Sequence, residues 1–183
     1  MFKKPIFLGA TSQICFGFLL TFSSSIGQTF FISLFAGEIR SELNLSHGMF
    51  GTFYSAATLT SALVFLWFGK FTEQFNLILL GLIAFIALSL FSLMLANTNT
   101  LFLLFFSLLG LRFFGQGLLG HIAITAMACW FSKKRGQALS FAALGYSFGE
   151  ALLPMLIAFF FTLLTWREIW FAVFLCIILI FLP

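Results

Sequence analysis

Residues 77–95 read LILLGLIAFIALSLFSLML, and this stretch contains no charged side chain. At 1.5 Å per residue, a helix of this length crosses the roughly 30 Å hydrocarbon core of a bilayer. A soluble domain would have to bury every face of such a helix, whereas lipid accommodates all of them. The stretch therefore predicts a transmembrane α-helix.

Similar stretches recur along the whole chain. The composition is 62% hydrophobic and only 8% charged, and phenylalanine alone supplies 30 of the 183 residues. Charges and turn residues divide the chain into six apolar spans, at residues 6–36, 48–69, 77–95, 101–131, 137–164 and 169–183. Short connections force neighbouring helices to run antiparallel. We therefore expect an all-α membrane protein whose residues 1–183 form one bundle of six transmembrane helices in the lipid bilayer.

The last of these spans is shorter than the others. Residues 169–183 provide only 15 positions, whereas a helix needs about 20 to cross a bilayer. The sequence thus predicts that the sixth helix is truncated.

The basic residues predict the orientation of the bundle. Cytoplasmic loops of membrane proteins carry an excess of Lys and Arg. If the N-terminus is cytoplasmic, the outer side holds only Arg40 and Arg167, and Arg112 lies within a span. The inner side then holds the remaining six: Lys3, Lys4, Lys70, Lys133, Lys134 and Arg135. We expect both termini in the cytoplasm and favour a bacterial inner membrane.

Several other classes of function lack support in the sequence. The longest basic cluster is Lys133 to Arg135, too short to predict binding to nucleic acid. Cys15, Cys129 and Cys176 all lie in apolar spans without metal-ligand spacing, so they predict neither a disulfide framework nor a metal site. No nucleotide-binding motif is present, and no cofactor is expected.

Two ionisable residues lie near the predicted middle of the membrane. Arg112 is in the fourth span and Glu150 is in the fifth, and a charge at this depth requires a partner, a watery cavity or a ligand. Their distances from the outer ends of their spans correspond to similar depths, roughly 17 and 22 Å. They either pair with each other, or one of them binds an anionic or proton-coupled substrate.

Polar residues also line particular helix faces. Gly17, Thr21, Ser24 and Gln28 share one face of the first span if that span is a continuous helix. This face either borders an aqueous cavity or packs closely against another helix. In the fourth span, Gln116 shares the face of Arg112. His121 lies on the opposite face, where it either relays protons or is hydrogen-bonded between helices.

An enzymatic reading rests on the residues 145–149, GYSFG, which fit the G-x-S-x-G pattern of a nucleophile elbow. That elbow requires a preceding strand, whereas an apolar helix is expected here. The chain also contains no Asp, and no His follows Ser147, so only an intramembrane dyad of Ser147 with His121 would remain. Small residues at helical spacing explain the same pattern as helix packing, and we do not expect an enzyme.

Motifs in spans two to five resemble those of the major facilitator superfamily. The family's inner loop has the form Gly-x-x-x-Asp-Arg, and residues 69–76, GKFTEQFN, keep the glycine as Gly69 and an acid as Glu73 but have Gln74 in place of the Arg. Residues 111–117, LRFFGQG, are similar to the family's Arg and Gln-Gly of the fourth helix. Residues 126–138, AMACWFSKKRGQA, look like its next inner turn.

This resemblance implies a function and a larger assembly. It implies half of a 12-helix secondary transporter, driven by a proton or another ion, with a C-terminal six-helix half in the same gene or in another chain. Arg112 would be the substrate-facing or coupling charge, with Gln28 and Tyr54 beside it. A buried Arg suits a carboxylate, which favours a small organic anion such as a monocarboxylate.

A different class of function remains open beside the transporter. The chain could be a non-transporting six-helix protein that assembles with or regulates another membrane protein. In that case, Gly145 and Gly149, four residues apart, would form the contact with the partner.

Overall fold

The computed structural model describes residues 9–72 and 75–181, and this part of the chain is helical without a strand. The helices α1 and α2, separated by the 3-10 turn η1, and α3 precede the long helix α4. The π-helical segment η2 lies between α6 and α7, and α8 and α9 follow. The bounds are α1 Ala10–Ser24, η1 Ser25–Gly27, α2 Thr29–Ser33, α3 Ala36–Glu42, α4 His47–Thr72, α5 Leu77–Ala96, α6 Leu101–Gly110, η2 Leu111–Leu119, α7 Gly120–Trp130, α8 Arg135–Phe160 and α9 Trp166–Phe181.

Five stretches in the described residues are helical, long and apolar enough to cross a membrane. They are Ala10–Ser33, His47–Gly69, Leu77–Ala96, Leu101–Trp130 and Arg135–Phe160. The last predicted span corresponds to α9, which has 16 residues and extends about 24 Å. The class of the fold, an all-helical membrane protein, is therefore confirmed with five such spans.

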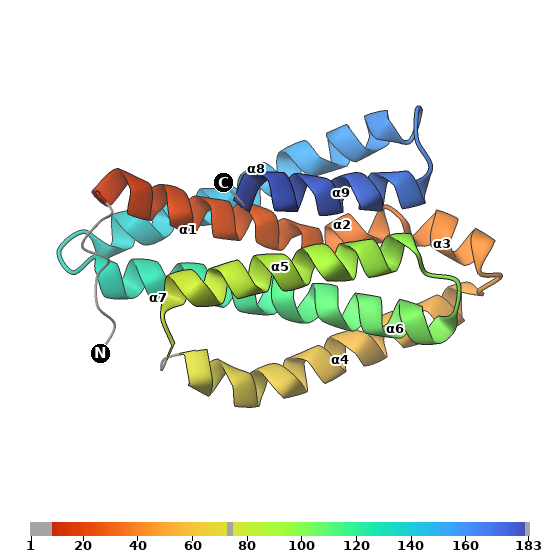
Figure 1. Ribbon diagram of the computed structural model, residues 1–183, viewed down its shortest axis with the longest axis horizontal. Coiled ribbons are helices and arrows are strands. Elements are labelled where there is room, and N and C mark those ends of the chain that lie inside the picture. The colour runs from red at the N-terminus through yellow and green to blue at the C-terminus, as the bar shows by residue number, and fades with distance from the viewer. Residues whose placement is uncertain (1–8, 73–74, 182–183) are drawn as a thin grey trace.

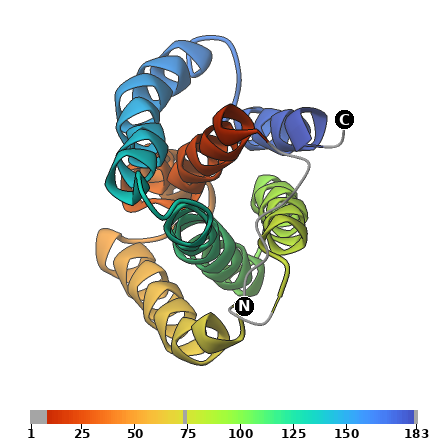
Figure 2. The ribbon, with the colours of Figure 1, turned by 90° about the vertical axis from the view of Figure 1, so that its left-hand side faces the viewer.

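The long helices lie roughly side by side along the longest axis of the molecule (Figure 1). Their connections alternate between the two ends. The turn between α7 and α8, with Lys133 and Lys134, lies at the left-hand end in Figure 1, and α3 and the α8–α9 turn lie at the right-hand end. Viewed from that left-hand end, α4 and α8 are spread apart at the outside, and α1 and α7 lie further in (Figure 2).

The first span is not the continuous helix that the sequence predicted. The helix α1 ends at Ser24, and Gln28 is extended at φ −78° and ψ 156° before α2 begins. Residues 23–27, SSSIG, explain the break, since Ser competes for backbone hydrogen bonds and Gly has no helix preference. The first span is thus two half-helices joined at Gln28.

Because of this break, the predicted polar face is divided. Gly17 and Thr21 pack against α8, where the Thr21 hydroxyl donates to the carbonyl oxygen of Ala142. Gly145 and Gly149 make room for this contact, because a Cβ at either position would collide with Thr21 or Ser25. The face is a packing seam up to Ser25, and Gln28 lies beyond it.

Helix α7 is preceded by nine residues of π-helix, the segment η2. Gly115 of η2 crosses Gly27 of η1 so closely that a Cβ on Gly115 would lie 2.7 Å from the Gly27 Cα. A π-helical turn holds an extra residue and widens the helix locally. The widened segment therefore lies directly against the break in the first span.

A polar cluster fastens the ends of several helices near the right-hand end of Figure 1. The Glu42 carboxylate accepts from Trp166 Nε1 at 2.6 Å and from Arg167 Nε at 2.9 Å. Arg167 also donates to the carbonyl oxygens of Ala96 and Thr98. This cluster, which we call the Arg167 clasp, connects α3, the α5–α6 turn and α9.

We expect the Arg167 clasp to make a small, pH-dependent contribution to the stability of the folded bundle. Hydrogen bonds from Arg167 and Trp166 lower the pKa of Glu42 below its ordinary value of 4.5. A lowered pKa in the folded state means that the contribution is complete at neutral pH and is lost as the pH falls below 4.5 through the lowered value. Because the Glu42 side chain is 47% exposed, we expect Glu42→Gln to cost only about 0.5 kcal/mol.

The measurement is the thermal midpoint Tm of the detergent-solubilised protein at pH 7 and at pH 3. Glu42→Gln is expected to lower Tm at pH 7 and to lower it less at pH 3, where protonation of Glu42 weakens the clasp in the unmodified chain. Glu38→Gln, one turn earlier on α3, is the control because Glu38 makes no ion pair within the described residues. Equal Tm losses for the two variants at pH 7 would contradict this account of the clasp.

Candidate functional site

Arg112 lies in the π-helical segment and is only 6% exposed. Its Nη1 donates to the Gly27 carbonyl oxygen at 3.0 Å and to the Thr29 hydroxyl at 3.3 Å. The extended residue Gln28 lies between these two acceptors. Arg112 thus supplies one hydrogen bond to a backbone carbonyl at the break in the first span, where regular helical bonding stops, and one to the side chain that follows the break.

Tyr54 of α4 completes this arrangement from the other side. Its hydroxyl donates to Thr29 Oγ1 at 2.8 Å, and the Arg112 guanidinium carbon lies 5.5 Å from the centre of its ring. An aromatic face attracts a cation at this distance. Residues of η1, α2 and α4 therefore fix the position of one buried guanidinium group, which η2 carries.

A cavity of about 320 Å³ lies beside this group, between α4 and η2. Its polar lining comes from Arg112, Gln116, Thr58 and Ser61, and its remaining lining residues are Ala62, Phe65 and Gly117. Arg112 Nε and Thr58 Oγ1 are buried and have no hydrogen-bond partner within the described residues. Buried polar groups are rarely left unpaired. A molecule bound in the cavity could accept a hydrogen bond from Arg112 Nε and form another with Thr58 Oγ1.

The structure does not bring Arg112 and Glu150 together. Glu150 is exposed on α8, and the ion pair found among the described residues joins Arg167 to Glu42. The depths of Arg112 and Glu150 along their helices do not decide whether they meet, because contact also depends on the direction in which each helix face points. The pairing hypothesis is wrong for this conformation, and Arg112 is held by the first span.

The other predicted site residues are distributed around Arg112. Gln116 lines the same cavity, as expected from its shared helix face, and is exposed. Tyr54 contacts Arg112 but does not line the cavity. Gln28 forms the break and is not among the lining residues.

His121 belongs to a different environment. Its Nε2 lies 3.0 Å from Thr72 Oγ1, and its ring packs edge-on against Phe65 at 5.5 Å between centroids. The cavity beside Arg112 does not include it. This arrangement matches the hypothesis of a histidine that is hydrogen-bonded between helices.

The predicted inner-loop motif is only partly visible. Gly69 lies near the end of α4, where an added Cβ would make an ordinary contact of 3.7 Å with the Phe65 ring. Space alone therefore does not require glycine at this position. Glu73 lies outside the described residues.

The glycine pair of α8 has no free surface for another chain. Gly145 and Gly149 are both buried against the first span. The hypothesis that they form a contact with a partner protein is therefore wrong. The same residues lie inside the continuous helix Arg135–Phe160, so Ser147 is not on the strand-to-helix turn of a nucleophile elbow.

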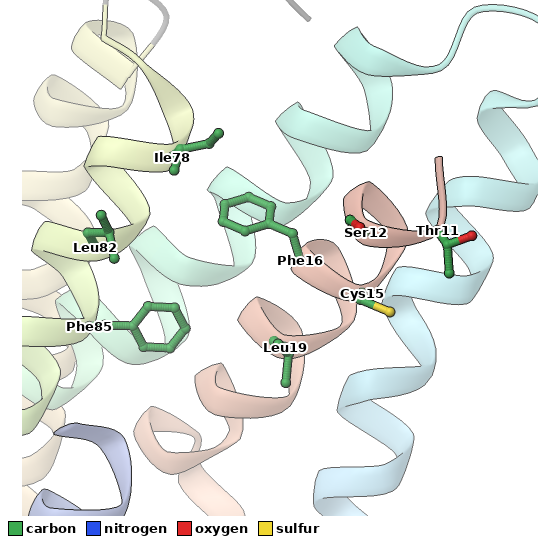
Figure 3. Close-up of a pocket in the computed structure, with 8 residues that line it drawn as sticks. All are labelled: Thr11, Ser12, Cys15, Phe16, Leu19, Ile78, Leu82 and Phe85. Atoms are coloured by element: carbon green, nitrogen blue, oxygen red, sulfur yellow. The ribbon is translucent and has the colours of Figure 1, made fainter. Parts of the chain in front are cut away.

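A second cavity, of about 410 Å³, lies between α1 and α5 (Figure 3). Its apolar lining includes Phe16, Leu19, Leu82 and Phe85, and its hydroxyl groups come from Thr11 and Ser12 at the start of α1. None of the described residues that line it is charged. Because the described lining offers hydroxyl groups but no charge to a solute, the Arg112 cavity is the better candidate site for an anion.

Three functional candidates were not predicted from the sequence: Thr29, Thr58 and Ser61. Thr29 contacts Arg112 directly, and the other two line its cavity. Thr58 lies in the stretch 51–62, whose small residues at helical spacing are typical of helix packing, and Thr29 follows Gln28 without any pattern of its own. The signal available was the run of Ser and Gly before Gln28, which marks a helix break.

Comparisons with known proteins identify a family. The model of the Major Facilitator Superfamily matches residues 17–183, nearly the whole chain. A search of curated proteins found no match, and neither did a search of solved structures. The match covers the break at Gln28, the π-helical segment and the Arg112 cavity together.

Proposed function

The chain belongs to the major facilitator superfamily, whose members transport solutes across membranes, and we propose that it is a secondary carrier of a small organic anion of the monocarboxylate type. In this proposal, Arg112 binds the carboxylate inside the bundle. Transport is coupled to a proton or another ion, since the sequence contains no nucleotide-binding motif.

The observation that carries this proposal is the buried guanidinium of Arg112, of which only one nitrogen has hydrogen-bond partners among the described residues. Nη1 is engaged by the first span, whereas Nε has no acceptor, and no hydrogen bond from Nη2 to the described residues is found. The Nε and Nη2 edge is the part of Arg that binds a carboxylate through two parallel hydrogen bonds. An anion at this edge would also offset the cost of a positive charge in the membrane, about 2.5–3.5 kcal/mol.

The cavity limits the size of the solute. Its volume of about 320 Å³ is at the lower end of the range of roughly 300–1,000 Å³ found for small-molecule sites. Thr58 Oγ1 offers an unused hydroxyl, and Gln116 adds an amide. Phe65 and Ala62 would contact a short apolar tail, which a monocarboxylate has.

We also propose that the six helices form one half of the transporter. A second six-helix half, from the same gene or another chain, would cover the exposed sides of α4 and α8. These two helices support the proposal because little of either is buried. In the apolar stretch of α4 11% is buried and in that of α8 17%, against 44% in α5. The end with Lys133 and Lys134 would face the cytoplasm, and the membrane would be a bacterial inner membrane.

The experiment compares a carboxylate with a neutral molecule of the same shape. We expect benzoate to raise the Tm of the purified chain and benzamide to leave Tm unchanged, because only the carboxylate satisfies the free edge of Arg112. A ligand at 100 times its Kd adds about 2.7 kcal/mol of stability, enough for a clear shift. The same pair, with acetate and acetamide beside it, would then be tested in liposomes under an imposed proton gradient.

Two results would contradict the proposed carboxylate transport. If benzoate and acetate shift Tm no more than their amides do, Arg112 is not an anion site. Uptake that follows the amides as well as the acids would equally exclude a carboxylate carrier.

A further inference from the structure

We propose that Thr29 is a positioning residue for Arg112, and that it links the anion site to the second half of the first span. This inference rests on the proposed function, because it assigns a role in anion binding to a residue outside the cavity lining. The site would then include the short helix Thr29–Ser33, which begins directly after the break at Gln28.

The hydrogen bonds of the Thr29 hydroxyl support this role. Its oxygen accepts from Tyr54 at 2.8 Å and from Arg112 at 3.3 Å, which uses both of its acceptor positions. Its own hydrogen has no acceptor among the described residues. Thr29 therefore connects a ring on α4 to the guanidinium on η2 and retains one donor for a further group.

The position of Nη1 determines which edge of Arg112 faces an anion. Gly27 and Thr29 together hold Nη1 against the first span, and no acceptor for Nε or Nη2 is found among the described residues. A planar guanidinium fixed at one nitrogen is oriented as a whole. Loss of the Thr29 oxygen would leave Gly27 as a single acceptor, about which the group can rotate.

The hydrogen bond between Arg112 and Thr29 connects the site to α2, which packs into an aromatic cluster beyond the break. Phe31 of α2 and Phe35, which directly precedes α3, both pack on the fully buried Trp170. The centroid of the Trp170 ring lies 5.4 Å from that of Phe31 and 5.0 Å from that of Phe35. A carboxylate that pulls on Arg112 while Nη1 stays bonded to Thr29 would shift the beginning of α2. Trp170 would then report that movement through its fluorescence.

The test compares Thr29→Val, which removes the oxygen and keeps the branched shape, with Thr29→Ser, which keeps the oxygen. We expect Thr29→Val to weaken benzoate binding about tenfold, the effect of one hydrogen bond to a charged group, and Thr29→Ser to restore most of it. Thr52→Val is the control, because the one hydrogen bond of the Thr52 hydroxyl found among the described residues is to Gly48 of its own helix. The Trp170 signal is the benzoate-dependent emission that Trp170→Phe removes, and we expect Thr29→Val to reduce it while Thr52→Val leaves it unchanged.

A second measurement needs no anion and separates this inference from the proposed function. Thr29→Val, Arg112→Met and the double variant form a thermodynamic cycle on Tm, in which interacting residues give non-additive losses. Additive losses would overturn the positioning role, as would benzoate binding that Thr29→Val leaves unchanged. If benzoate fails to bind the unmodified chain, the proposed function fails, and the cycle still decides whether Thr29 positions Arg112.

Discussion

Replacing Gly115 with alanine is expected to lower the stability of the folded bundle severely. The added Cβ would lie 2.7 Å from the Cα and 2.9 Å from the backbone nitrogen of Gly27. Backbone atoms cannot rotate away as a side chain can, so the two helices must separate. We expect a loss of about 3 kcal/mol, the upper part of the usual range for overpacking.

Gly117→Ala is the matched control, since it adds the same methyl group to the same π-helical segment. Its Cβ would lie 3.4 Å from a carbon of the Phe65 ring, a side chain that can give way. The measurements are Tm and the monodisperse fraction in size-exclusion chromatography. If Gly115→Ala and Gly117→Ala are equally stable, the close crossing of Gly27 and Gly115 does not hold the bundle together.

Hydropathy predicted the regular part of this fold because lipid imposes a simple requirement on it. A segment that crosses the membrane must satisfy its own backbone and present apolar side chains. The predicted span 77–95 therefore coincides closely with the helix Leu77–Ala96. Such a signal requires no knowledge of the neighbouring helices.

The irregular part of the fold depends on distant partners and was therefore not predictable by the same reasoning. The break at Gln28 is tolerated because Arg112, 85 residues after Gly27, donates to the buried Gly27 carbonyl oxygen. Helical periodicity placed Gln28 on the face of Thr21, an inference that fails once the helix stops at Ser24. Likewise, the depth of Glu150 was estimated from chain length, but the direction in which its side chain points depends on how α8 packs on α1.

Arg112→Met is expected to abolish carboxylate binding while leaving the chain folded. Removal of one partner from a buried, hydrogen-bonded charge pair typically costs 2–5 kcal/mol, so affinity for benzoate should fall by at least about 100-fold. The fold should persist because methionine fills a similar volume and removes the charge from the membrane interior. The lost bonds to Gly27 and Thr29 would offset part of that gain in stability.

Arg112→Lys separates the charge from the geometry of the side chain. Lysine retains the positive charge but lacks the planar fork, so it cannot contact the first span through one nitrogen and bind a carboxylate through two others. We expect about tenfold weaker benzoate binding and a KM for uptake raised by a similar factor, between the unmodified chain and Arg112→Met. Titrations of purified protein and initial uptake rates in liposomes would provide these values.

Arg40→Met serves as the control for the loss of one positive charge, because Arg40 lies in α3, beyond the first membrane span. It should leave the affinity for benzoate unchanged. Full benzoate affinity in Arg112→Met would show that the carboxylate binds elsewhere. Equal losses in Arg112→Lys and Arg112→Met would instead show that the geometry of the guanidinium group, with its separate edges for the helix break and for the solute, is what the site requires.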